Sequence, residues 1–366
     1  MGQSASEPAR AAEREARGAD GGLFLAYLQE KLPMVEEALG LAGAAPLDAT
    51  GPTADLDRYL YQPLRRFTAS GGKRVRPVLA LLGAEAVGGL AEDALSTGVA
   101  IELFQSAALI HDDIADQSEL RRGEPCLHRA IGTGPALNAG DLALTEVFEV
   151  VLADAQMPPA RKLRVLGELV RMERHTLEGQ ALDLGWAGTG RWDFSSDDCL
   201  YMIDGKTAWY SVAMPLYLGA LCGGAEPASA AGLIDLGRHA GLAFQLQDDL
   251  LNLVGDAEAQ GKDFRSDITE SKRTFAVMWA LERLDAAERQ QLKDLLESRT
   301  AEPAELERAV ALVERGGGID RCRELARSEV GLAQNGAREL AERGVVSARA
   351  RDLLCSMAAF FVERAS

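Results

Sequence analysis

From Leu23 onward, apolar residues recur three and four positions apart along the chain. This spacing places them on one face of a helix, so it predicts a succession of amphipathic helices. Short stretches rich in glycine, proline or aspartate interrupt the pattern and predict short connections, at 44–52, 71–72, 188–190 and 316–318. The sequence has neither an alternating strand pattern of useful length nor a repeat of fixed period. It therefore predicts an all-α fold, a single large helical bundle.

The first 22 residues differ from the rest of the chain. They are small and charged residues with almost no large apolar side chains, so they cannot bury enough surface to fold alone. We expect a disordered tail at 1–22, followed by one all-helical domain at 23–366.

Charge and cysteine content limit the partners and the compartment. The formal net charge of −17 would repel a nucleic-acid backbone, and no strong basic patch offsets it. The five cysteines lie far apart without a CxxC pair, so neither a zinc site nor a disulfide framework is indicated. No signal peptide or apolar run of roughly 18 to 20 residues stands out. We expect a cytoplasmic protein without a transmembrane segment that binds no nucleic acid.

The most informative segment is the apolar stretch 101–116, which ends in Asp112, Asp113 and Asp116. In a helix, Asp112 and Asp116 lie one turn apart on the same face, so their carboxylates can converge on a cation. Magnesium prefers oxygen ligands and is commonly held by one or two carboxylates completed by water and phosphate. Clustered aspartates without cysteine therefore favour Mg²⁺ over zinc.

A second acidic cluster, Asp248, Asp249 and Asn252, repeats this spacing with an amide in the last place. One such motif alone is most often a solvated helix face. Two copies, each interrupting an apolar run, change this interpretation because an uncompensated buried charge is costly. The pair indicates a bound cation or a water-filled cavity.

Basic residues accompany both acidic motifs. A cation held by few carboxylates needs further oxygens, and a diphosphate supplies them while adding negative charge that lysine and arginine must balance. The cationic residues near the two motifs are Lys73, Arg74, Arg76, Arg121, Arg122, Lys206, Lys262 and Lys272. Each could be ordinary surface charge, but together they describe a metal-bridged diphosphate site.

Six segments in this order resemble the trans-isoprenyl diphosphate synthase family: GGKRVRP, LIHDDIADQSELRRGEPCLH, GDLAL, GKTA, FQLQDDLLNLVGD and GKDFRSDITESKRT. The resemblance extends from about Leu23 to the C-terminus. It implies a helical bundle of the isoprenoid synthase type around a central active-site cavity. It also implies the condensation of isopentenyl diphosphate, head to tail, with an allylic diphosphate, and a homodimer.

The resemblance implies a role for each matching residue. Three Mg²⁺ ions would be held, two by Asp112, Asp113 and Asp116 and the third by Asp248 and Asp249. The allylic diphosphate would contact Arg121, Lys206 and Lys262, with Lys272 close by. Isopentenyl diphosphate would be held by Lys73, Arg76, Gln105 and Arg122. The developing carbocation would face Thr207 and Gln245. The departing diphosphate would take the proton. His111, beside the metal aspartates, would support them or be structural rather than act as a base.

Two positions depart from the common pattern of the family. Gln105 stands where many members have histidine, but its amide can still donate to a phosphate. Asn252 replaces the last aspartate of the second motif, as in some members that make C20 products. Neither change removes a required function.

The resemblance also suggests a product length. The growing chain would run beside the helix that precedes the first motif, where Ala107 and Ala108 are small enough to let it pass. Phe104 lies one further turn away, about 5.4 Å or close to one isoprene unit, and could stop the chain. The predicted product is the C20 geranylgeranyl diphosphate. If Phe104 faces elsewhere or only packs in the core, the product would be longer.

Three alternative functions are less consistent with these residues. A terpene cyclase on the same scaffold would have no use for a second diphosphate site, so Lys73, Arg76 and Arg122 argue against it. A metal-dependent phosphohydrolase generally needs several histidine ligands, and this chain has four widely spaced histidines. A non-catalytic subunit of a heteromeric synthase is disfavoured because both acidic motifs are complete.

Overall fold

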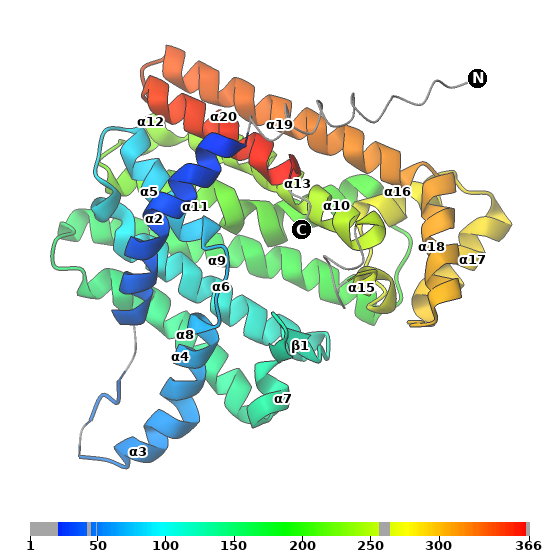
Figure 1. The fold of residues 1–366 in the computed structure, drawn as a ribbon, viewed down its shortest axis with the longest axis horizontal. Helices are drawn as coiled ribbons and strands as arrows, with labels where there is room; N and C mark the ends of the chain where they lie inside the picture. Colours follow the sequence, from blue (N-terminus) through cyan, green and yellow to red (C-terminus); the bar gives the residue numbers. More distant parts are fainter. Residues whose placement is uncertain (1–20, 42–44, 49, 256–263, 364–366) are drawn as a thin grey trace. The chain divides into compact units, whose positions relative to one another are not determined.

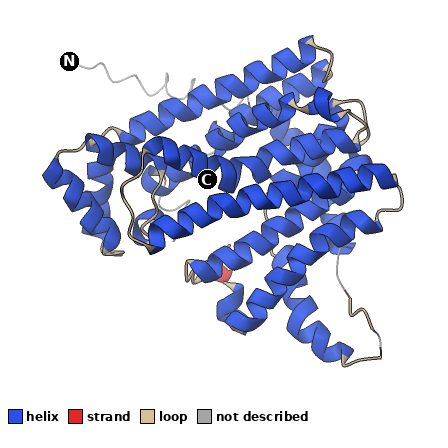
Figure 2. Ribbon diagram, turned by 180° about the vertical axis from the view of Figure 1, so that it is seen from behind, coloured by secondary structure: helices blue, strands red, loops and turns tan. Residues whose placement is uncertain are grey.

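The structure, a computed structural model, describes residues 21–41, 45–48, 50–255 and 264–363 (Figure 1). Helices make up nearly all the regular structure of these residues, so the all-α prediction is confirmed (Figure 2). The first helix begins at Gly22, while residues 1–20 of the expected tail lie outside the described part. All five cysteines are free thiols.

The helices group into two compact units that alternate along the chain. The first-motif unit, 28–173 and 215–230, contains Asp112. The second-motif unit contains Asp248 and consists of the described residues of 1–27, 174–214 and 231–366. The expectation of one all-helical domain at 23–366 stays a prediction.

The first-motif unit takes its helices mainly from the N-terminal half of the chain. Its elements are most of α2 (Gly22–Leu41), α3 (Thr53–Leu56), the π-helix η1 (Asp57–Tyr61), α4 (Gln62–Ala69), α5 (Val75–Ala86), the 3₁₀-helix η2 (Ala91–Ala94), α6 (Leu95–Ala115), α7 (Leu127–Ile131), α8 (Thr133–Ala153), the start of α9 (Pro159–Gly188), most of α11 (Met214–Cys222) and α12 (Pro227–Ala230). Strands β1 (Leu120–Arg121) and β2 (Glu124–Pro125) form a short antiparallel hairpin, too short for an alternating sequence pattern to reveal.

Helix α6 forms the centre of this unit and packs beside α5 and α8. A stretch ending with α6, Ala91–Ala115, is long and apolar enough to span a membrane by length and composition, although the sequence pattern did not single it out. The most apolar part of this stretch is 72% buried inside the protein, as expected for a core helix. Glycines allow α5 and α11 to cross closely, because a Cβ at Gly83 would lie 2.2 Å from the carbonyl oxygen of Leu216.

The second-motif unit takes its helices mainly from the C-terminal half. Its elements are the end of α9, α10 (Ser196–Ile203), the π-helix η3 (Asp204–Ala213), α13 (Gly232–Val254), α15 (Ser266–Thr269), α16 (Phe275–Arg283), α17 (Ala286–Glu297), α18 (Pro303–Arg315), α19 (Gly318–Glu342) and α20 (Ala348–Glu363). Helix α13 packs against η3, α19 and α20. Figure 1 shows α19 and α20 alongside it. A large apolar core joins α10, α13, α16, α17, α18 and α19.

Candidate active site

The first aspartate motif lies at the carboxyl end of α6. Asp112 and Asp113 are in its last turn, and Asp116 caps the helix, with its backbone N–H 2.8 Å from the carbonyl oxygen of Asp112. Asp113 is 1% exposed, whereas Asp112 and Asp116 are half-buried. The carboxyl end of a helix carries partial negative charge, so three aspartates here are unfavourable unless cations balance them.

Arg121 balances the innermost aspartate. Its Nε lies 3.0 Å from Oδ1 and 3.3 Å from Oδ2 of Asp113. Burial lowers the pKa of Arg121, but the hydrogen bonds to Asp113 and the charges of Asp113 and Asp112 outweigh burial and raise the pKa above its usual value. The guanidinium therefore stays charged and neutralises Asp113.

The hairpin places Arg122 on a different partner. Arg122 and Gly123 form its two-residue turn with positive φ angles of 55° and 84°, a conformation that matches the twist of the strands. Arg122 donates to the hydroxyl of Ser70 at 3.1 Å and to the carbonyl of Gly71. A Cβ at Gly72, where φ is 141°, would lie 3.0 Å from this guanidinium, so glycine leaves room for it.

Arg74 anchors the segment that carries Lys73 in the loop and Arg76 in the first turn of α5. It is 3% exposed, and its guanidinium lies 2.8 Å from Glu36 and 2.8 Å from Glu102. Burial lowers the pKa of Arg74, but these two glutamates outweigh burial and raise the pKa above its usual value. The buried charge is therefore compensated. In the sequence, Arg74 is only one member of a cationic group, and the pattern does not reveal this structural role.

The residues proposed to set product length lie along α6. Phe104 and Gln105 are buried, Ala107 is fully buried in a cluster with Leu64 and Phe67, and Ala108 is half-buried. Burial of Phe104 fits both a tunnel floor and core packing, so its role stays a prediction.

His111 lies against α8. A Cβ at Gly140 would lie 2.3 Å from its Nε2, so the imidazole occupies the space that this glycine leaves open. The same nitrogen is 3.5 Å from the carboxylate of Asp141. This packing agrees with a structural role for the histidine.

The second aspartate motif lies inside α13 rather than at its end. Asp249 is 5% exposed and accepts a hydrogen bond of 2.8 Å from the side-chain amide of Gln245 one turn earlier, while Asp248 is half-buried. Burial and the charge of Asp267 raise the pKa of Asp249 well above its ordinary value. A cation bound beside this carboxylate would lower the cost of its charge.

Asn252 connects α13 to α15. Its amide nitrogen donates to the hydroxyl of Ser266 at 3.0 Å, and its amide oxygen accepts from the backbone N–H of Asp267 at 3.2 Å. The backbone carbonyl of Asn252 also accepts a hydrogen bond of 2.8 Å from the backbone N–H of Arg265. The amide at this position therefore holds Asp267 near the motif.

A cavity of about 100 Å³ brings charged residues of the second-motif unit together. It is lined by Asp183, Met202, Ile203, Lys206, Thr207, Gln245, Asp249, Asp267, Lys272, Arg273 and Thr274. Lys206 lies 2.5 Å from Asp183, and Lys272 lies 3.7 Å from Asp267 and 2.6 Å from Glu270. Burial, opposed by Lys272, raises the pKa of Asp267 to about 6. The predicted residues Lys206, Thr207, Gln245, Asp249 and Lys272 thus share one cavity.

Helix packing places Lys206 in this cavity. Lys206 and Thr207 belong to the π-helix η3, a form of helix found frequently at functional sites. A Cβ at Gly179 of α9 would lie 2.2 Å from the backbone nitrogen of Lys206, so glycine permits the close approach of α9 and η3.

Three charged lining residues were not predicted. Asp183 lies far from the first motif in the sequence and has no aspartate neighbour. Asp267 and Arg273 lie in the segment GKDFRSDITESKRT, where neither has an assigned role, and Arg273 is 2% exposed. Polar residues at Gln180 and Asp183, one turn apart in an amphipathic helix, were the available signal. Lys262, predicted to bind the allylic diphosphate, lies outside the described residues.

The donor set is suited to magnesium. In the part of the chain that the structure describes, no three His, Cys, Asp or Glu side chains gather closely enough to form a metal site by themselves. The aspartates of the two motifs offer carboxylate oxygens only, and Mg²⁺ commonly takes one or two of these with water and substrate phosphate. The residues therefore fit this ion bound together with a diphosphate.

Residues 57–313 match the family described as Polyprenyl synthetase. The chain belongs to this family. A polyprenyl synthetase relative, the short chain isoprenyl diphosphate synthase of Methanothermobacter thermautotrophicus, is 39% identical over 297 residues, which cover 81% of this chain and 87% of the relative. The geranylfarnesyl diphosphate synthase of Natronomonas pharaonis is 36% identical, with coverages of 83% and 90%.

A solved structure of the same family shares the fold. The geranylgeranyl pyrophosphate synthetase of Pyrococcus horikoshii superposes with a TM-score of 0.80 at 33% identity, covering 94% of this chain and 98% of that one. This similarity places the chain in the isoprenoid synthase fold that the sequence motifs predicted.

Proposed function

We propose that this polyprenyl synthetase is a Mg²⁺-dependent prenyltransferase that condenses isopentenyl diphosphate, head to tail, with an allylic diphosphate and releases diphosphate. Family membership carries the reaction class. The cavity that combines Asp249 and Asp267 with Lys206 and Lys272 supports the chemistry, because it offers carboxylates for a divalent cation and ammonium groups for a diphosphate.

Magnesium, when bound, neutralises the diphosphate and makes it a better leaving group. We propose three ions for each active site, two held by Asp112, Asp113 and Asp116 and the third by Asp248 and Asp249. Asp267 and Asp183 supply further negative charge beside Asp249 and orient the lysines of the same cavity.

Cationic side chains bind the two substrates in this proposal. Lys206 and Lys272 stabilise the charge of the departing allylic diphosphate, an electrostatic effect that is usually the largest catalytic contribution. Arg121 and Lys262 contact the same diphosphate. Isopentenyl diphosphate is held by Lys73, Arg76, Gln105 and Arg122. Thr207 and Gln245 face the allylic cation with their oxygen atoms, and the departing diphosphate accepts the proton.

The proposed product is geranylgeranyl diphosphate, with Phe104 as the floor below Ala108 and Ala107. The names of the relatives include both geranylgeranyl and geranylfarnesyl products, so chain length has to be measured on this protein. The purified chain is incubated with Mg²⁺, isopentenyl diphosphate and, separately, dimethylallyl, geranyl and farnesyl diphosphates, and the products are identified by mass. We expect a C20 diphosphate, and a longer one from Phe104→Ala. An unchanged length in Phe104→Ala would remove the floor but not the reaction.

We further propose a cytoplasmic homodimer. Along α9, the exposed residues Leu163, Val170, Leu177 and Leu184 are seven positions apart, so they recur on nearly the same face of the helix. Such a stripe fits a second copy of the chain. Light scattering of the purified protein should give twice the monomer mass, and Leu177→Glu should reduce that mass.

A further inference from the structure

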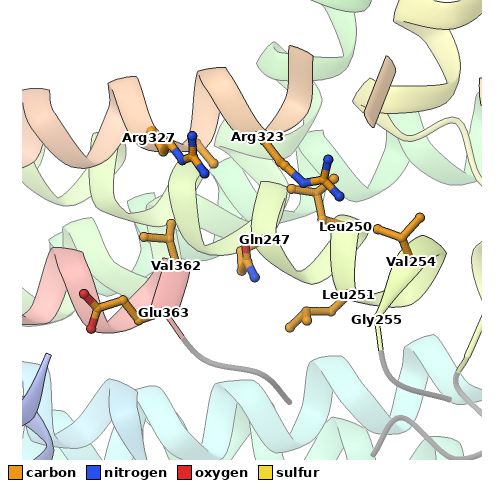
Figure 3. Close-up of a pocket in the computed structure, with 10 residues that line it drawn as sticks. Gln247, Leu250, Leu251, Val254, Gly255, Arg323, Arg327, Val362 and Glu363 are labelled. Atoms are coloured by element: carbon orange, nitrogen blue, oxygen red, sulfur yellow. The ribbon is translucent and has the colours of Figure 1, made fainter. Parts of the chain in front are cut away.

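A groove of about 600 Å³ lies in the second-motif unit between α13, α19 and the end of α20 (Figure 3). Its lining residues include Leu250, Leu251, Val254, Arg323, Arg327 and Val362. None of these residues lines the cavity that contains Asp249 and Lys206. Its volume falls within the range of about 300 to 1,000 Å³ that is typical of small-molecule sites.

Packed aromatic residues fix the walls of the groove. Phe361 of α20 meets Phe244 of α13 edge-on at 5.1 Å between ring centroids and lies 6.2 Å from Phe24. These contacts hold the last turn of α20, and hence Val362, against α13. At one end, the carboxylate of Glu363 accepts a hydrogen bond of 3.1 Å from the backbone N–H of Gly21, so its charge already has a partner.

Most of the floor of the groove is apolar, although the amide of Gln247 also lines it. Leu250, Leu251 and Val254 follow one another along α13, and Val362 lies at the end of α20, where Figure 3 shows these side chains around the opening. Val254 is 38% exposed. A hydrocarbon chain along this surface would remove apolar area from water, which favours binding.

The opposite edge is cationic. Arg323 and Arg327 lie one turn apart on α19, both are exposed, and Figure 3 shows them along the same edge. Arg323 has an exposed ion pair of 3.0 Å with Asp320, a kind of pair that holds little free energy. Within the described residues, Arg327 has no ion-pair partner. Two neighbouring guanidinium groups are well suited to the oxygens of a phosphate-type head group.

We propose that this groove binds a single-chain lipid phosphate, with its chain along Leu250, Leu251 and Val254 and its head group on Arg323 and Arg327. Isoprenoid diphosphates belong to this class, and their identification as the ligand rests on the proposed function. Leu250 and Leu251 directly follow Asp248 and Asp249 on α13. The ligand would therefore contact the part of α13 that carries the second motif without occupying the charged cavity.

Calorimetric titration of the full chain in EDTA tests this site, because chelation removes metal-bridged diphosphate binding at the aspartate motifs. The probes are a non-cleavable farnesyl thiolodiphosphate, dodecyl phosphate and inorganic diphosphate. We expect the two amphiphiles to bind at least tenfold more tightly than inorganic diphosphate. A preference for the farnesyl probe assigns an isoprenoid ligand, and a preference for dodecyl phosphate assigns a saturated lipid. Equal binding of both supports their shared chemistry.

Three variants locate the binding. The double variant Arg323→Gln/Arg327→Gln removes the head-group site, and Val254→Glu places a negative charge on the apolar wall. Each should weaken amphiphile binding at least tenfold. Arg338→Gln is the matched control, because Arg338 also lies on α19, pairs locally with Asn335 at 2.8 Å and does not line the groove. Thermal melting of each variant reports on folding.

Absence of amphiphile binding, or equal binding by folded wild type and both groove variants, would overturn the proposal. Inorganic diphosphate binding that is equally tight and is weakened by Arg323→Gln/Arg327→Gln would overturn the apolar part of the site, because binding at Lys73, Arg76 and Arg122 does not depend on these arginines. Condensation is measured separately with Mg²⁺, so an active synthase without groove binding contradicts only this inference. An inactive chain with intact groove binding contradicts only the proposed function.

Discussion

The two aspartate motifs have nearly the same sequence but different electrostatic surroundings. In the first-motif unit, Asp113 is buried at the end of α6 and is paired with the charged Arg121. In the second-motif unit, Asp249 is buried inside α13, accepts from the neutral amide of Gln245 and lies near the buried Asp267. The inner aspartate of the first motif is therefore paired with a charged arginine, and that of the second motif with a neutral amide.

This difference gives the two inner aspartates different roles, one in the fold and one in binding a cation. Asp113 contributes to the fold through its ion pair, since removing one partner of a buried pair leaves the other uncompensated. Burial disfavours the ionised form of Asp249, as its raised pKa indicates. A bound metal ion should therefore stabilise Asp249 more than Asp113.

The largest expected effect is on catalysis. Asp249→Asn and Asp112→Asn each remove one charged ligand from a proposed magnesium site, and each should lower kcat/KM by a factor of about 100 to 1,000. Steady-state condensation assays at saturating Mg²⁺ measure this loss. A change of less than threefold in either variant would show that its motif is not part of the catalytic machinery.

The second-largest effect is a difference in stability between variants of Arg74 and of Asn252, which each hold a segment beside one motif. Arg74→Met leaves Glu102, which is 4% exposed, without its buried partner, so it should lower the free energy of unfolding by about 3 kcal/mol. Asn252→Ala removes only neutral hydrogen bonds and should cost about 1 kcal/mol. Urea unfolding compares the two. Arg65→Met, which breaks an exposed pair with Asp57, is the control and should cost less than about 1 kcal/mol.

The same substitution in both motifs should affect metal-free stability in opposite ways. Asp113→Asn leaves Arg121 without its carboxylate and should cost about 2 kcal/mol, less than a fully buried pair because Arg121 is partly exposed. Asp249→Asn replaces a carboxyl group whose ionised form burial disfavours, so it should leave the free energy of unfolding unchanged or raise it. Thermal melting in EDTA measures both. Equal losses in the two variants would remove the distinction between the motifs.

The smallest effect concerns the attachment of α13 to α19. The hydrogen bond from His239 to Glu329, at 2.6 Å, raises the pKa of His239. The folded state then holds this proton more tightly, so the stabilisation is complete below the unfolded pKa of about 6.5 and is lost as pH rises through the folded pKa. Because His239 is partly exposed, we expect a loss of about 0.5 kcal/mol between pH 6 and 9. Glu329→Gln should abolish this pH dependence in urea titrations.

The sequence predicted the helices well because its apolar periodicity is strong from Leu23 onward. It also identified Lys206, Thr207, Gln245, Asp249 and Lys272, which the structure brings into one cavity. Their types and order are local features of the chain. Such features are visible without coordinates.

The partners of these residues could not be predicted in the same way. Arg74 meets Glu36 and Glu102 across long sequence separations, and Asp183 reaches the cavity from a different helix than Asp249. Asn252 was expected only to retain a carbonyl oxygen for the motif, whereas its amide binds Ser266 and Asp267. These roles depend on tertiary contacts, which spacing along one helix does not encode.

The central claim is condensation of two diphosphates, and the dependence of diphosphate release on isopentenyl diphosphate tests it most directly. The purified chain is given Mg²⁺ and one allylic diphosphate, and released diphosphate is measured with and without isopentenyl diphosphate. We predict release only when isopentenyl diphosphate is present, with one diphosphate formed for each molecule of it consumed. Release at the same rate without isopentenyl diphosphate, accompanied by a hydrocarbon product, would contradict the account and indicate a terpene cyclase.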